Sequence, residues 1–245
     1  MKQMHKEKHQ FALFVQDFRI DAQVTIIIKD ADTVHRINSV LRLAVGDELV
    51  VFNNVSAFFV TITQLTKKLV TTHIVRKEGI PTFVPEITVL LPLLKKEALE
   101  DALYACVELG VTTIMLVTTD KTHSIPFSPA YHQRLTKIIH GAQEQAKQYV
   151  PVLLEGPLSL SEAVKRCQNN SHKIVALQGG GSLAVSFVKN IPSVTVAIGP
   201  EADFSAGEKT YLREQGFHAC SLGPTVLRAQ QAVTVLVGSI RVLTV

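Results

Sequence analysis

The chain has 245 residues, of which 47% are hydrophobic and 19% charged, and this balance excludes a disordered chain and indicates one or two globular domains. The formal net charge of +4 permits a polyanionic partner without demanding one. Every long apolar stretch is interrupted by a charge or a breaker, and no signal-peptide core follows the basic start, so we expect no membrane association.

The three cysteines, Cys106, Cys167 and Cys220, are odd in number and far apart. Their spacing is not that of metal ligands, and free thiols suit a reducing cytoplasm best. We therefore expect three buried structural thiols in a cytoplasmic protein, and no metal site.

The first eighty residues have the pattern of a small β-rich domain. Short apolar and β-branched runs predict strands at 11–15, 24–28, 48–52, 57–63 and 69–75. Asp32 is placed to cap a short helix that runs to Arg42. Short strands at such regular intervals favour a small barrel.

A linker at 81–85, which holds two prolines, separates this domain from a second one at 86–245, in which strands and helices alternate. Strands are predicted at 87–91, 112–118, 152–154, 174–177, 195–198 and 219–222, and helices at 96–109, 131–148, 159–167, 205–215 and from 226 onward. Two helix starts carry a capping box, Ser159 with Glu162 and Ser205 with Glu208. Strands with helices between them favour a parallel α/β sheet.

Three of these strands end in glycine-containing loops, at 177–180, 198–201 and 222–227. Open α/β sheets bind ligands at the carboxyl ends of their strands, and glycine lets the backbone approach a ligand closely. The triple glycine at 179–181 lacks the spacing of a nicotinamide-binding loop, and by itself it fits a surface turn equally well.

The residues of two of these loops resemble the C-terminal signature of the ribosomal small subunit methyltransferase E family. The first motif runs I-G-P-E from Ile198 to Glu201 and continues with Phe204, Ser205 and Glu208; the second runs from Leu222 to Arg228, with Ala232 beyond it. Members of this family methylate uridine N3 in 16S ribosomal RNA, belong to the SPOUT superfamily and use S-adenosylmethionine. The resemblance extends weakly along nearly all of the chain.

This resemblance implies both a fold and a donor pocket. The expected fold class is α/β: a SPOUT-type parallel α/β domain with a trefoil knot at 86–245, preceded by a PUA-like RNA-binding β-barrel at 1–80. In SPOUT proteins three loops at corresponding strand ends form the S-adenosylmethionine pocket. The donor-binding residues implied here are Leu177, Gln178, Gly179, Ile198, Gly199, Pro200, Glu201, Leu222, Gly223, Val226 and Leu227.

Methylation of uridine N3 requires that a proton leave a poor nucleophile, so the site needs a base or a cation that stabilises the resulting anion. Arg228 follows the third loop and keeps its proton at any working pH, which suits it to the stabilising role. Glu201 in the second loop is the candidate to orient the uridine or accept the proton. Its alternative role is that of a carboxylate favoured near the start of the next helix.

The resemblance also implies 16S ribosomal RNA as partner, in the decoding region of the small ribosomal subunit. Arg36, Arg42 and Lys147 are the candidate RNA contacts. Val40, Leu41 and Arg42 match a family motif, and the residues before Pro151 loosely match another. Without the resemblance, such side chains are more often solvated helix residues than RNA contacts.

The last predicted helix is more apolar than packing of one face against its own sheet requires. Its stripe consists of Val233, Leu236, Val237, Ile240 and Leu243. SPOUT proteins commonly dimerise through this helix, so we expect a homodimer that uses it. The alternative is a helix buried wholly within one subunit.

Three departures from the family pattern leave other functions open. Ala202 and Asp203 replace a Gly-Gly pair, Ala105 replaces a lysine, and Gln230 replaces a glutamate. A side chain where the family has glycine opposes a positive φ or narrows the pocket. The alternatives are a weakened or inactive relative that only binds RNA, and a SPOUT enzyme that acts on a different RNA.

Overall fold

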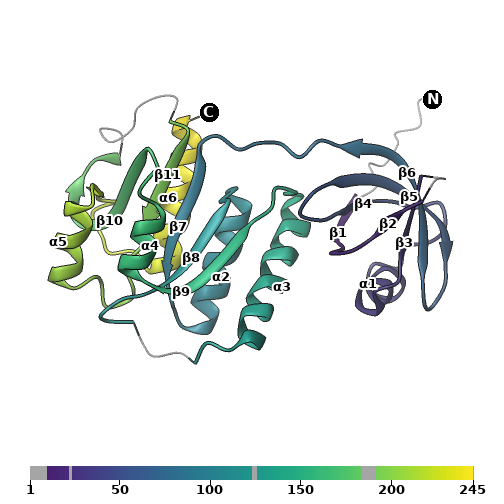
Figure 1. Ribbon diagram of the computed structural model, residues 1–245, viewed down its shortest axis with the longest axis horizontal. Coiled ribbons are helices and arrows are strands. Elements are labelled where there is room, and N and C mark those ends of the chain that lie inside the picture. Colours follow the sequence, from purple (N-terminus) through teal and green to yellow (C-terminus); the bar gives the residue numbers. More distant parts are fainter. Residues whose placement is uncertain (1–9, 22–23, 123–125, 184–190, 245) are drawn as a thin grey trace. The chain divides into compact units, whose positions relative to one another are not determined.

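The computed structural model describes residues 10–21, 24–122, 126–183 and 191–244 (Figure 1). The chain forms two compact units, Met1–Pro81 with Gln143–Pro151, and Thr82–Ala142 with Val152–Val245. The sequence did not predict that Gln143–Pro151 belongs to the first unit. The helical pattern at 131–148 does not show against which hydrophobic core each turn packs. Within the described ranges, no helix combines the length and apolar character that a membrane crossing requires.

The first unit is built on a six-stranded sheet with the strand order β1-β4-β5-β6-β3-β2. The strands are β1 (Phe11–Phe14), β2 (Arg19–Ile20), β3 (Thr25–Ile28), β4 (Glu48–Phe52), β5 (Ala57–Leu65) and β6 (Val70–Glu78). β1 and β4 are parallel, and the other neighbours are antiparallel. The five predicted strands are confirmed, whereas the two-residue β2 is too short to leave a pattern in the sequence.

A short helix, α1 (Ala31–His35), continues into the π-helical turn η1 (Arg36–Val40). Its cap is Asp30 and not the predicted Asp32: an Asp30 carboxylate oxygen accepts a hydrogen bond from the Thr33 backbone N–H at 2.8 Å. Asp30 has the extended backbone that a cap requires, and Asp32 lies in the first turn. The helix buries Val34 and Ile37 in the core of this unit.

The segment Gln143–Pro151 completes the first unit. The ring of Tyr149 lies 5.0 Å from that of Phe52, next to a buried cluster on β1, β4 and β5. Glu144 accepts hydrogen bonds from the Phe14 backbone N–H at 2.9 Å and from Arg36, with which it forms an ion pair at 2.5 Å. The Glu144 side chain is only 9% exposed, so this residue is not part of a solvated helix end, whereas Gln145 and Lys147 are exposed.

The second unit contains a six-stranded, entirely parallel sheet with the strand order β12-β10-β11-β7-β8-β9. Its strands are β7 (Glu86–Pro92), β8 (Thr113–Thr118), β9 (Leu153–Ser159), β10 (His172–Gly181), β11 (Ser193–Ala197) and β12 (His218–Cys220). The six predicted strands and their parallel arrangement are confirmed. One difference is that β10 continues through Gly181, where a loop was predicted from residue 178.

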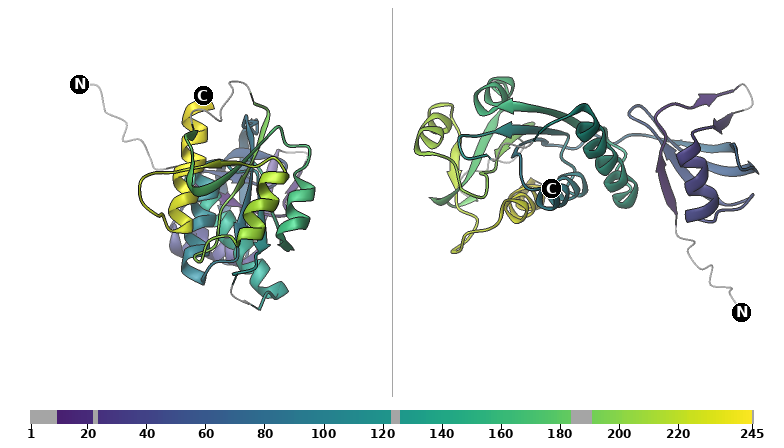
Figure 2. Two further views of the ribbon diagram at one scale, coloured as in Figure 1. Left: turned by 90° about the vertical axis from the view of Figure 1, so that its left-hand side faces the viewer. Right: turned by 90° about the horizontal axis from the view of Figure 1, so that it is seen from below.

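Helices cover both faces of this sheet, in three layers (Figures 1 and 2). One face packs against α2 (Lys96–Glu108), α3 (Pro129–Ala146) and α6 (Ala229–Thr244), and the other against α4 (Leu160–Arg166) and α5 (Ala206–Glu214). Both predicted capping boxes are present, at Ser159 and Ser205. Helix α6 begins three residues later than predicted because the chain through Arg228 belongs to a loop.

Most of the apolar stripe on α6 is buried within its own unit. Val233, Leu236, Val237 and Ile240 are fully buried among the residues of α2 and the sheet, while Leu243 is 46% exposed. For these four residues the alternative of burial within one subunit is correct, and the homodimer stays a prediction. The cysteines are buried as predicted, and burial raises the pKa of Cys106 to about 12.

Candidate functional site

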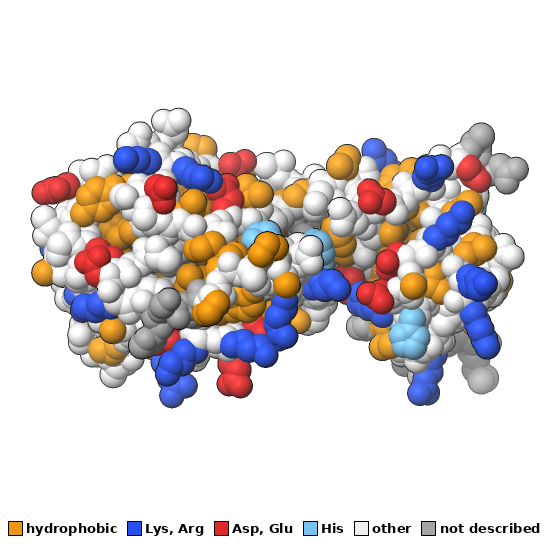
Figure 3. All heavy atoms as spheres, turned by 60° about the horizontal axis from the view of Figure 1, so that its bottom comes forward, with side chains coloured by type: hydrophobic (Ala, Val, Ile, Leu, Met, Phe, Trp, Pro, Cys, Tyr) orange, Lys and Arg blue, Asp and Glu red, His pale blue; other side chains and the backbone are white. Residues whose placement is uncertain are grey.

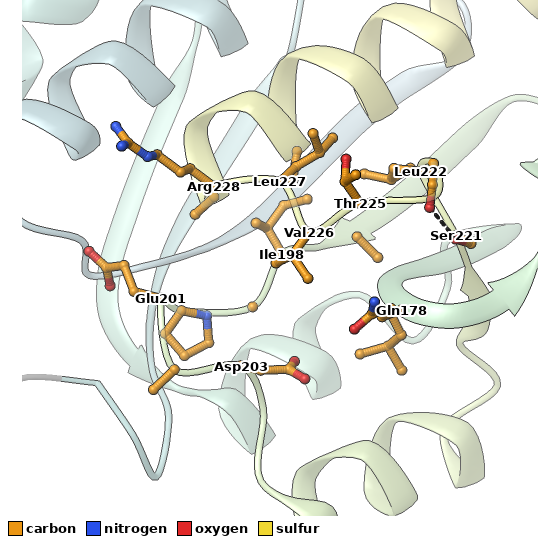
Figure 4. A pocket seen from close by; sticks show the side chains of 18 residues that line it. Gln178, Ile198, Glu201, Asp203, Ser221, Leu222, Thr225, Val226, Leu227 and Arg228 are labelled. Atoms are coloured by element: carbon orange, nitrogen blue, oxygen red, sulfur yellow. Dashed lines mark hydrogen bonds between the residues drawn. The ribbon is translucent and has the colours of Figure 1, made fainter.

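A pocket of about 470 Å³ opens at the carboxyl ends of β10, β11 and β12 (Figure 4). Its lining residues come from three segments, 176–178, 198–203 and 221–229, and from Ala232 of α6. Within the third segment, Pro224 does not line the pocket. The predicted loops after β11 and β12 thus meet at one place with residues 176–178, which belong to strand β10 and not to the predicted loop. A cavity of this size is typical of sites for small organic ligands.

The pocket has an apolar centre and polar ends. Ile198, Leu222, Val226 and Leu227 contribute apolar side chains, and Ile198 is 1% exposed. Figure 4 shows Glu201 and Arg228 on one side, with Asp203 and Gln178 on the other. Apolar walls with a few convergent polar groups bind a ligand and fix its orientation.

The pocket contains every predicted donor-binding residue except Gly179. It also contains Asp203, Ser221 and Thr225, which were not among the predicted binding residues. The assignment of Gly179 stays a prediction. The signal that could have found Asp203 was its place two residues after the I-G-P-E motif, where it counted only as a departure from the family.

The glycines after Leu177 have a structural role in β10. A Cβ on Gly180 would lie 2.7 Å from backbone atoms of Ala219 and Cys220, so only glycine lets β10 and β12 approach this closely. In the third loop Gly223 has a φ of +155°, a conformation that other residues rarely adopt. Gly180 therefore allows the close packing of β10 and β12, and Gly223 shapes the pocket that it lines.

The second loop is held by side chains from outside it. Lys121 donates a hydrogen bond to the Ala202 carbonyl oxygen at 3.0 Å, and the Ser205 hydroxyl donates one to Asp120 at 2.6 Å. The Asp120 backbone N–H in turn donates to Glu208 at 2.9 Å. The loop between β11 and α5 is thereby fixed to the end of β8.

Asp203 adopts a left-handed backbone conformation, with a φ of +59°. The expectation that a side chain at this position opposes a positive φ is therefore wrong. Aspartate and asparagine enter this region more readily than most residues, because their short polar side chains bond to nearby backbone. The Asp203 carboxylate does so, accepting from the Phe204 backbone N–H at 2.7 Å.

The predicted catalytic side chains are both exposed at the edge of the pocket. Arg228 is the residue before α6, and its carbonyl oxygen accepts the hydrogen bond of the Ala232 backbone N–H at 2.9 Å. Glu201 follows Pro200 at the end of the I-G-P-E motif. The pocket thus contains a permanent cation and a carboxylate, which can stabilise an anion and accept a proton.

The candidate RNA contacts belong to the first unit. The hydrogen bond from Arg36 to Glu144 raises the pKa of Arg36, and its side chain is 43% exposed. Arg42 and Lys147 are exposed, and both have a φ of +52°. Arg36 thus stabilises the first unit through its ion pair, and part of its side chain remains accessible.

Comparison with known proteins identifies the family. Residues 82–241 match the model of the RNA methyltransferase domain. Because this match spans more than half of the chain, the chain belongs to the family of RNA methyltransferase domains.

Curated relatives of this chain are named as ribosomal RNA methyltransferases. The chain is 26% identical over 217 residues to ribosomal RNA small subunit methyltransferase E of Rickettsia conorii, covering 86% of each chain. It is 26% identical over 234 residues to the protein of the same name from Synechocystis, covering 91% of this chain and 74% of that one. The resemblance inferred from the two loop motifs is thereby confirmed.

Solved structures share the fold. A methyltransferase from Legionella pneumophila in complex with bound SAM has a TM-score of 0.87 at 23% identity, covering 97% of this chain and 99% of that one. Ribosomal RNA small subunit methyltransferase E from Neisseria gonorrhoeae, bound to S-adenosyl methionine, has a TM-score of 0.87 at 20% identity, covering 96% and 98%.

Proposed function

We propose that this protein transfers a methyl group from S-adenosylmethionine to N3 of a uridine in 16S ribosomal RNA. The observation that carries the proposal is one pocket at which residues 176–178 of β10 meet the loops after β11 and β12, in a chain of the RNA methyltransferase family. Relatives named for the small-subunit RNA support the substrate. Neighbours of the same fold that were solved with the donor support the cofactor.

The pocket fits the chemical character of this donor. S-adenosylmethionine supplies a methyl group on a sulfonium, together with an aromatic base, a ribose and an amino acid. The apolar centre formed by Ile198, Leu222 and Val226 suits the base, and the polar ends suit the remaining groups. Gly199 and Gly223 line the pocket, and without a side chain their backbone hydrogen-bonding groups can approach the ligand closely.

In the proposed reaction, Arg228 and Glu201 act on the uridine. Both lie on one side of the pocket (Figure 4). Glu201 orients the base or accepts the N3 proton, and Arg228 stabilises the anion that remains. Since a guanidinium keeps its charge, Arg228 supplies this stabilisation at every working pH.

The first unit is proposed to bind the RNA. We propose that its sheet is a PUA-like barrel, that the second unit contains the family's trefoil knot, and that two copies form a homodimer. Lys and Arg side chains are scattered over the face of both units seen in Figure 3. In the first unit Arg36, Arg42 and Lys147 would contact phosphates, which position an RNA without reading its sequence.

Two measurements test the proposal. Isothermal titration calorimetry with S-adenosylmethionine should give one site per chain, and labelled methyl groups should pass to 16S RNA, free or within small subunits. Donor binding without transfer to either form would leave the two alternatives, an inactive relative and an enzyme that acts on a different RNA. Absence of donor binding would contradict the proposal.

A further inference from the structure

We propose that the carboxylate of Asp203 contacts the methyl donor directly and determines its affinity. It would accept hydrogen bonds from a donating group of the ligand, either the ribose hydroxyls or the ammonium of the amino acid. The proposal rests on the proposed function, because it takes S-adenosylmethionine to be the ligand of the pocket.

The backbone places Asp203 in the pocket wall. Its N–H donates to the Pro200 carbonyl oxygen at 2.9 Å, closing a turn, and its φ of +59° directs the chain into Phe204. Phe204 is 1% exposed and anchors the loop in the core beneath α5. The Asp203 side chain remains 51% exposed and lines the pocket.

The side chain is held in one orientation. One carboxylate oxygen accepts from the Phe204 backbone N–H at 2.7 Å, and the other accepts from Lys209 at 2.5 Å. A Cβ on Gly199 would lie 3.4 Å from the first of these oxygens, so this glycine leaves room beside the carboxylate. Each carboxylate oxygen has two acceptor sites, so both can take a further hydrogen bond from a ligand.

The charges of the pocket are unevenly distributed. Of the described residues that line it, three are charged, and Glu201 and Arg228 lie together, away from Asp203. Asp203 points toward the side where Gln178 lies (Figure 4). Because this acceptor is already oriented, a ligand that donates hydrogen bonds gains the contact without ordering a side chain.

If Asp203 only stabilised the start of α5, its replacement would leave donor affinity unchanged. Asp203 lies two residues before Ser205, the cap of α5, where a carboxylate stabilises a helix through its dipole. Such a role affects unfolding of the free protein and leaves ligand affinity unchanged. Donor affinity therefore separates the two roles.

The test compares Asp203→Asn and Asp203→Gly with the parent by calorimetry, using S-adenosylmethionine. Both replacements tolerate a positive φ, so the turn should persist, and thermal unfolding of the free proteins checks this. We expect each variant to bind about 10- to 100-fold more weakly, the range for a hydrogen bond to a charged group. Glu214→Gln, on an exposed residue of α5 outside the lining set, is the matched control and should bind within about twofold of the parent.

A second ligand identifies the group that Asp203 contacts. 5′-Methylthioadenosine keeps the ribose hydroxyls and lacks the amino acid. Weaker binding of both ligands to the Asp203 variants would assign the ribose, and weaker binding of S-adenosylmethionine alone would assign the ammonium. Affinities within twofold of the parent for both ligands would overturn the role of Asp203 and leave the proposed function intact. A parent protein that binds no donor would overturn both.

Discussion

The guanidinium of Arg241 on α6 donates a hydrogen bond to the carbonyl oxygen of Leu109, at the end of α2, at 3.0 Å. It also donates to the carbonyl oxygens of Gly110 at 2.6 Å and Pro85 at 2.8 Å. Leu109 is the C-cap of α2, and the last carbonyls of a helix lack partners within it, so Arg241 satisfies a group that would otherwise need water. Arg241, the one charged residue among the last twelve of the sequence, therefore stabilises the second unit.

Arg241→Met should destabilise the protein by about 1–3 kcal/mol, because it removes the donor from partly buried carbonyl groups. Urea unfolding followed by circular dichroism measures the loss. Arg213→Met, on an exposed arginine in the last turn of α5, is the control and should change the free energy of unfolding by less than about 0.5 kcal/mol. Equal losses in the two variants would contradict the capping role.

Glu144→Gln should destabilise the first unit. The replacement weakens an ion pair with Arg36, and Glu144 is nearly buried in that pair. Because Arg36 is partly exposed, we expect the free energy of unfolding to fall by about 1–3 kcal/mol, less than for a fully buried ion pair. The matched control is Glu100→Gln, which breaks the more exposed pair with Arg134 and should cost less than about 1 kcal/mol. A smaller loss at Glu144 than at Glu100 would contradict this account of the segment Gln143–Pro151.

The homodimer prediction now rests on the exposed side of α6. Val237 is fully buried in its own unit, so a charge there would unfold the protein without testing an interface. Val242 is 78% exposed on the same helix, and Val242→Glu should weaken a dimer while the fold persists. Light scattering at micromolar concentration checks both points. A parent that is monomeric there contradicts the dimer, and an unchanged variant dimer contradicts the use of this helix.

Arg228→Ala should lower the methylation rate about 100-fold, which is the scale of losing one electrostatic stabiliser of the transition state. Donor affinity should stay nearly unchanged. The rate is measured at saturating RNA and donor, and the affinity by calorimetry. Arg228→Lys keeps the charge and should recover part of the rate. A rate of the alanine variant within twofold of the parent would remove Arg228 from the proposed mechanism.

Local signals predicted most of the fold. The capping residues Ser159 and Ser205 fixed two helix starts, because their hydrogen bonds depend on residues only three positions away. Alternation of strands and helices likewise predicted the parallel sheet. The cap was predicted at Asp32 and is Asp30, because both residue types satisfy the same local rule and only the backbone conformation separates them.

What depends on distant residues could not be predicted. Gly180 looked like part of a loop, since the strand that approaches it lies forty residues further along the chain. The ion pair of Arg36 with Glu144 joins positions 108 residues apart. Asp203 counted as an obstacle in the pocket, because neither its left-handed backbone nor its partner Lys209 is visible in the motif.

The most direct test of the central claim is mass spectrometry of nucleosides from 16S ribosomal RNA of cells that lack this protein. We predict that N3-methyluridine is lost from this RNA in those cells and returns when the parent chain is supplied. The Arg228→Ala variant should restore it slowly or not at all. An unchanged amount of N3-methyluridine in the cells that lack the protein would contradict the account.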